Sequence, residues 1–149
     1  MYKPLFFLMI LAIWFLSNTP NLMVLEPKTW ISEPMYEEGI RSLVFLIQQE
    51  SSFYHGYDNI WELNFIVHKV SHVFCYAILT IFLCKSFKGL SAHFAFFIIS
   101  GLAFSDEVHQ YFVVGRSGRL ADVGIDLIGF TIGIFLVKAM KKGKQRRPF

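Results

Sequence analysis

Four apolar segments constrain the fold of this 149-residue chain more than any other feature. They cover residues 4–25, 65–87, 92–114 and 120–140. The last three are each near the length that a helix needs to cross a bilayer, roughly 20 residues. Only 17% of the residues are charged, below the quarter that is usual in soluble proteins. We therefore expect an all-α membrane protein whose four transmembrane helices form a bundle, with one domain over residues 1–149.

The first segment is shorter than the others in its unbroken apolar part, from Leu5 to Leu16. A signal peptide is one interpretation, with Lys3 as its charged start. No small-x-small cleavage site follows, however, and the apolar character resumes at Leu22, after Pro20. We expect a retained membrane anchor.

The loop between the first two segments has one periodic stretch, Pro34 to Gln49. Its apolar residues recur at the spacing of one helical face, and its charged residues lie elsewhere. That face consists of Tyr36, Ile40, Leu43, Val44 and Ile47. We expect an amphipathic helix that lies on the membrane or caps the bundle from the extracytoplasmic side.

The distribution of charge predicts the orientation. With both termini in the cytoplasm, the inner side carries nine Lys and Arg and no acidic residue, whereas all eleven Asp and Glu lie outside. The positive-inside rule favours this arrangement. The basic run Lys138 to Arg147 is then a topology anchor that contacts anionic lipids, and we expect no nucleic-acid partner because no base-reading element accompanies the run.

In this topology the candidate site residues gather at the extracytoplasmic ends of the last three segments. They are, in chain order, Lys69, His72, Tyr76, Asp106, Glu107, His109, Gln110, Arg116, Arg119, Asp122 and Asp126. The first three are three and four residues apart, which places them on one helical face. A carboxylate inside a span costs about 2.5–3.5 kcal/mol at the helix centre, so such groups are normally paired or functional.

The last segment combines two carboxylates with two glycines. Asp122, Asp126, Gly129 and Gly133 fall within about 60° of one another at 100° per residue. A GxxxG spacing lets another helix backbone approach closely. The partner is either a helix of the same chain or a second copy in a homo-oligomer.

The string from Ser105 to Val123, with its Asp-Glu pair, Gln110, Gly-Arg loop and Asp122-Val123, resembles the signature of the VanZ-like family of bacterial membrane proteins. Lys69-x-x-His72-x-x-x-Tyr76 is similar to that family's second-span motif, and Phe15 to Pro20 loosely to the end of its first span. The resemblance implies a multi-pass protein of the bacterial cell membrane, related to one that raises resistance to the glycopeptide teicoplanin. Asp126 departs from the family pattern, which usually has Asn there.

Several functions are compatible with these residues. Arg116 and Arg119 suit an anionic headgroup of a membrane lipid, a lipid-linked precursor or a lipoglycopeptide. Ligand-binding roles fall to Lys69, Tyr76, Gln110, Arg116, Arg119, Asp122 and Asp126, and candidate catalytic roles to Asp106, Glu107, His72 and His109. A proton relay is a third hypothesis. The fourth is a purely structural network, since four carboxylates nearly balance three cations.

A metal site has less support from the sequence. Asp106 and His109 are three residues apart and would have to combine with His72 and Glu107 from elsewhere. Cys75 and Cys84 lie about 13 Å apart along a helix, too far for a disulfide. We predict no metal and no cofactor.

Overall fold

The computed structural model describes residues 2–37, 42–57 and 60–145, and it is all-α, as predicted. Its α-helices are α1 (Tyr2–Ser17), α2 (Leu63–Ser86), α3 (Ala92–Gln110) and α4 (Leu120–Gln145). Three short 3-10 helices, Pro27–Trp30, Leu43–Leu46 and Ser52–Tyr54, lie in the loop between α1 and α2.

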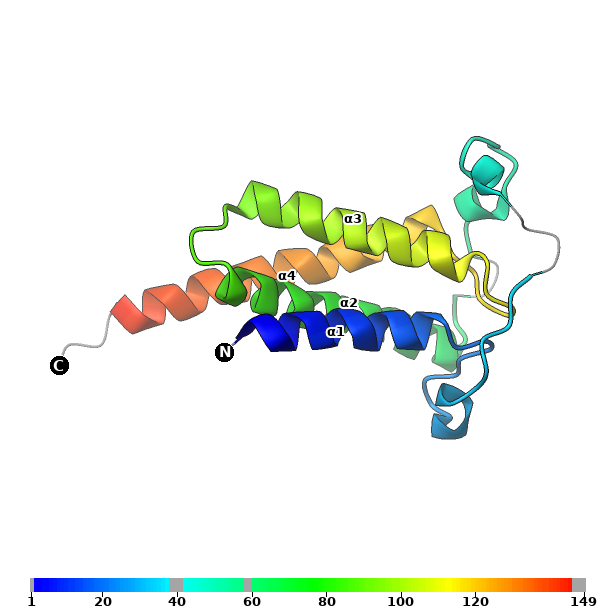
Figure 1. The fold of residues 1–149 in the computed structure, drawn as a ribbon, viewed down its shortest axis with the longest axis horizontal. Helices are drawn as coiled ribbons and strands as arrows, with labels where there is room; N and C mark the ends of the chain where they lie inside the picture. The colour runs from blue at the N-terminus through cyan, green and yellow to red at the C-terminus, as the bar shows by residue number, and fades with distance from the viewer. Residues whose placement is uncertain (1, 38–41, 58–59, 146–149) are drawn as a thin grey trace.

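The four helices run side by side along the long axis of the molecule (Figure 1). The start of α1, the turn between α2 and α3, and the end of α4 lie together at one end. The long loop after α1 and the loop between α3 and α4 lie together at the other. We call this second end the polar end, because the acidic side chains of α3 and α4 reach it.

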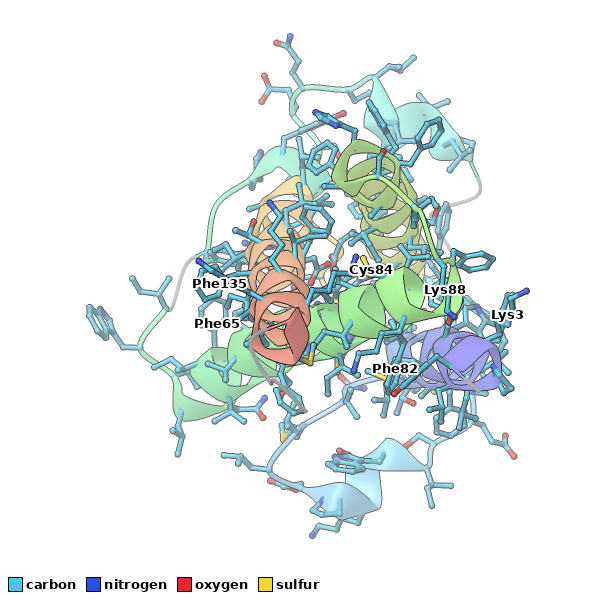
Figure 2. The ribbon with its side chains drawn as sticks, turned by 90° about the vertical axis from the view of Figure 1, so that its left-hand side faces the viewer. Lys3, Phe65, Phe82, Cys84, Lys88 and Phe135 are labelled. Carbon is cyan, nitrogen blue, oxygen red and sulfur yellow. The ribbon has the colours of Figure 1, made fainter. Side chains whose placement is uncertain are left out.

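Two of the helices, within the part of the chain that the structure describes, are long and apolar enough to cross a membrane. These are α2 and residues Leu120–Gly143 of α4, with mean hydropathies of 1.7 and 2.0. Helix α1 is equally apolar in character but has only 16 residues. Many large apolar side chains face outward, among them Leu8, Phe74 and Phe135. Figure 2, viewed along the bundle from the end with the chain termini, shows Phe135 pointing away from α4.

The first apolar segment does not form one helix over residues 4–25. Helix α1 ends at Ser17, where the backbone N–H of Asn18 and of Thr19 donate to the carbonyls of Trp14 and Leu16. Pro20 has no N–H to continue the helix, and Asn21 follows with a positive φ of 48°. The next segments match their predicted ranges more closely, although α3 ends at Gln110 and not at residue 114.

The predicted amphipathic helix at Pro34–Gln49 is wrong for the residues that the structure describes; Ile40 lies outside them. Residues 35–37 are extended and pair with the loop after α3: Glu37 N–H donates to the Phe112 carbonyl at 2.9 Å, and Val114 N–H to the Met35 carbonyl at 2.9 Å. This pairing satisfies backbone groups that a helix would otherwise satisfy. The apolar residues of the stretch form only the 3-10 turn Leu43–Leu46.

The predicted close approach at the two glycines of α4 is made within the chain, by α2. A Cβ on Gly129 would lie 2.4 Å from the Val73 carbonyl oxygen, and a Cβ on Gly133 would lie 2.7 Å from that of Ala77. Each distance is too short for a real side chain, so the helix backbones are in direct contact there. A second copy of the protein would have to displace α2 to use the same stripe.

Candidate functional site

The acidic pair of α3 lies in the interior and is tied to the end of α1. Asp106 and Glu107 are 8% and 1% exposed. The Ser17 hydroxyl donates to Asp106 Oδ1 at 2.5 Å, and Gln110 Nε2 donates to Asp106 Oδ2 at 3.0 Å. Gln110 is one helical turn after Asp106, so the two share a face. The C-terminal end of α1 therefore packs against the acidic face of α3.

The loop between α3 and α4 brings two arginines to the same groups. Arg116 Nη2 donates to Gln110 Oε1 at 2.7 Å, and the backbone N–H of Arg119 donates to Glu107 Oε2 at 3.0 Å. Burial lowers the pKa of the Arg116 guanidinium, whereas the carboxylates of Asp106 and Glu107 oppose that shift. Among the described residues, the buried Nε of Arg116 has no hydrogen-bond partner.

Gly118 makes this loop geometry possible. A Cβ there would lie 1.9 Å from the Glu107 carbonyl oxygen and 2.6 Å from the Tyr111 nitrogen. Any other residue would push the loop away from the end of α3. The adjacent backbone N–H of Arg119 would then lose its position on Glu107.

Lys69 and Asp122 form an ion pair between α2 and α4. Lys69 Nζ lies 2.5 Å from Asp122 Oδ1, and the Tyr57 hydroxyl donates to the same oxygen at 2.5 Å. Burial and the hydrogen bond to Asp122 raise the pKa of Tyr57, which keeps its hydroxyl a neutral donor. The Tyr57 ring is also close to two cations, with Lys69 Nζ 4.8 Å and Arg119 Cζ 5.1 Å from its centroid.

Deeper in the bundle, three helices contribute one group each to a compact cluster. His72 Nδ1 of α2 lies 2.9 Å from Asp126 Oδ1 of α4 and 3.9 Å from Glu107 Oε1 of α3. Asp126 is 0% exposed. Tyr76 stacks on the His72 imidazole from one turn further along α2, with ring centroids 6.4 Å apart. We call His72, Glu107 and Asp126 the buried triad.

A cavity of about 430 Å³ opens beside these residues, between α1, α2 and the loop after α1. Its wall is mostly apolar, with side chains such as Ile13, Leu16 and Phe74. Its polar lining comes from His68, His72, Asp106 and Arg116, with Ser71. The cavity volume lies in the range of ligand sites, and an apolar body with a few polar groups is typical of them.

The structure brings together ten of the eleven predicted site residues, and places His109 elsewhere. Its Nε2 lies 3.2 Å from Asn18 Oδ1, and its ring stacks on Trp14. On a helix, position 109 is about 200° from position 107, so it points away from Glu107. A metal set that joins His109 to His72, as considered from the sequence, is not formed.

Ser17, Tyr57 and His68 were missed by the sequence analysis. Ser17 could have been found from the sequence, because it lies in the segment that resembles the end of the family's first span. His68 is one turn before His72, and their ring centroids are 4.8 Å apart. Nothing in the sequence around Tyr57 indicates that this loop residue reaches Asp122.

Comparison with known proteins gives one result. The family model described as VanZ/LLP1 matches residues 4–141, most of the chain and all of the residues above. The resemblance seen in the motifs of the last three segments is thereby confirmed. No curated protein and no solved structure matches the chain.

Proposed function

The chain belongs to the VanZ/LLP1 family, and from this premise we propose that it binds the anionic headgroup of a lipid or lipid-linked molecule at the extracytoplasmic face of the bacterial cell membrane. In this proposal all four helices cross the membrane and both termini are cytoplasmic. The common position of the start of α1, the α2–α3 turn and the end of α4 supports that topology (Figure 1). Lys3, Lys85 and Lys88 belong to that end, as the positive-inside rule requires.

The observation that carries the proposal is the cavity, which combines an apolar wall with a charged end. An acyl or isoprenoid chain suits the wall formed by Ile13, Leu16 and Phe74. A phosphate suits Arg116, whose planar guanidinium has a buried Nε without a partner among the described residues. One ligand with both parts is a lipid.

Chemical modification of the bound headgroup is a second candidate. His72 lines the cavity and also contacts the carboxylate of Asp126 at 2.9 Å. A histidine held by a carboxylate and open to a ligand is a common arrangement for general acid–base catalysis. Binding requires only Arg116 and the cavity, so it is the simpler function.

Lipid retention tests the binding proposal. The full chain is purified from membranes as wild type, Arg116→Gln and Lys28→Gln, and co-purified lipids are quantified by mass spectrometry. Lys28 is exposed and lies outside the cavity, so it is the matched loss of one cation. We expect a phosphate-bearing lipid to be enriched with wild type and Lys28→Gln and to fall at least five-fold with Arg116→Gln. Equal retention in all three would contradict the proposal and favour a purely structural network.

Susceptibility to teicoplanin and whole-cell lipid composition separate binding from modification. We propose that expression of the wild type lowers teicoplanin susceptibility and that Arg116→Gln abolishes the effect. A new lipid species that appears with wild type and not with Glu107→Gln indicates modification. An unchanged lipid profile together with altered susceptibility indicates binding alone. A change in susceptibility that depends on the proton-motive force would instead favour the proton relay.

A further inference from the structure

The buried triad has the composition and spacing of a metal site. One nitrogen and two carboxylates, from three different helices, offer one ligand atom each, and these atoms all lie within 4.8 Å of one another. The separations of His72 Nδ1 from Asp126 Oδ1 and Glu107 Oε1 are 2.9 and 3.9 Å. Ligands of a tetrahedral Zn²⁺ at about 2.0–2.1 Å are about 3.3 Å apart, which lies between these two values.

Asp126 provides an independent observation. This side chain is 0% exposed, and its Oδ2 has no hydrogen-bond partner among the described residues. In the part of the chain that the structure describes, the polar partner of its other oxygen is His72 Nδ1, 2.9 Å away. Leaving a carboxylate oxygen buried and unpaired is costly, and a charged partner removes that cost. The unpartnered Oδ2 and the Oδ1 that contacts His72 are the two oxygens of one carboxylate. Oδ2 therefore lies next to the ligand atoms of the buried triad.

The charges around the triad point the same way. Four carboxylates lie near three cations, so the formal charge of the set is −1. The carboxylates are those of Asp106, Glu107, Asp122 and Asp126, and the cations are Lys69, Arg116 and Arg119. A cation bound among these groups is favoured by that excess of negative charge. A bound dication changes the balance to one positive charge in excess, and the low polarity of the bundle interior strengthens this effect.

We infer that His72, Glu107 and Asp126 bind one divalent transition-metal ion, of the Zn²⁺ or Mn²⁺ type, between α2, α3 and α4. A mixed imidazole and carboxylate set suits these ions better than Mg²⁺ or Ca²⁺, which take oxygen ligands. The Arg119 N–H holds Glu107 Oε2 at 3.0 Å, which orients this ligand from outside the site. Three protein ligands leave a further coordination position. The inference stands on the triad and does not require the lipid.

Metal content tests the inference directly. The full chain, purified in detergent and stripped with a chelator, is reloaded separately with Zn²⁺, Mn²⁺ and Mg²⁺, dialysed, and analysed by elemental mass spectrometry. We expect about one Zn²⁺ or Mn²⁺ per chain and no retained Mg²⁺. Asp126→Asn and Glu107→Gln keep the side-chain volumes, and each should lower the retained metal at least ten-fold. Cobalt(II) absorption in the visible range reports whether the ligand set is the same in each variant.

His93→Gln is the control for adventitious binding, since His93 is exposed at the opposite end of α3. It should retain as much metal as the wild type. Circular dichroism and gel filtration establish that Asp126→Asn and Glu107→Gln are folded. Wild type that retains no metal, or that retains as much as folded Asp126→Asn and Glu107→Gln, overturns the inference. Protons on the carboxylates are then the remaining way to satisfy Asp126.

The lipid assay on metal-stripped and reloaded protein separates this inference from the proposed function. Metal retention without lipid retention supports the metal site and contradicts the lipid proposal. Lipid retention in a protein that takes up no metal supports the lipid proposal and contradicts the metal site. Lipid retention that rises several-fold on reloading supports both, because the cation then supplies the missing positive charge.

Discussion

Helix α2 has two different neighbours, and the contrast between its two sides separates stability from binding. Against α4 it packs backbone to backbone at Gly129 and Gly133, with no space for even a methyl group. Against α1 it leaves a cavity of about 430 Å³, because Ile13 and Leu16 are large and α1 ends at Ser17. Glycines allow close packing of α2 against α4, whereas the bulky residues of α1 and its early end leave a cavity between α1 and α2.

The largest effect is expected at the contact between α2 and α4. Gly129→Leu places a side chain against the Val73 carbonyl and should destabilise the protein by about 3 kcal/mol or more. Gly124→Leu is the matched control, since a Cβ there meets nothing within 4 Å. Thermal unfolding of the purified variants measures the difference. Equal stability of the two would mean that α2 and α4 are not in direct contact.

The second prediction concerns Gly118, which makes a similar close approach at the polar end. Gly118→Ala should cost about 1–3 kcal/mol and weaken lipid retention, because the loop moves and Arg119 N–H leaves Glu107. Gly101→Ala, on an open face of α3, should leave lipid retention unchanged and should not lower stability, because alanine favours a helix over glycine. The same thermal and lipid measurements apply. Loss of stability with full lipid retention would show that this loop supports only the fold.

The third prediction fills the cavity between α1 and α2. Ser71 lines the cavity, and its hydroxyl donates to the Val67 carbonyl of its own helix, which already belongs to the helical backbone, so Ser71→Leu adds volume to the cavity wall. We expect lipid retention to fall about five-fold, near 1 kcal/mol, with little change in stability. Thr131→Leu is the matched control, because Thr131 is exposed and bonds its own helix in the same way. Undiminished retention in Ser71→Leu would place the lipid outside this cavity.

The smallest effect is expected at His109. Its side chain contacts Asn18, Trp14 and Tyr36 and lies outside the buried triad, so His109→Gln should change lipid retention and metal content less than two-fold. His72→Gln should abolish metal retention. A comparable loss in both variants would mean that the site extends across α3 toward α1.

Much of this arrangement is readable from helical spacing. Positions 69, 72 and 76 share a face, as do 106 and 110, and 122 and 126, so the sequence predicted which side chains point inward. The same geometry separates His109 from Glu107, which the sequence analysis did not use. Spacing within a helix is local, and it is reliable because the turn of the helix fixes it.

The loop could not be predicted in this way. The periodicity of Pro34–Gln49 favoured a helix, but extended pairing of residues 35–37 with the loop after α3 prevailed. Tyr57 likewise reaches Asp122 across 65 positions of sequence. Both depend on partners far along the chain, and no local pattern encodes them.

The sequence by itself determined the helical segments, the charge asymmetry between the two ends and the family. These follow from composition, periodicity and motif, which are properties of short stretches. Only the tertiary structure decided that Gly129 faces α2, that Ser17 holds Asp106, and that His72, Glu107 and Asp126 meet. Those contacts depend on the rotation and the axial position of each of the four helices relative to its neighbours. Packing between helices sets both, whereas residue spacing along one helix sets neither.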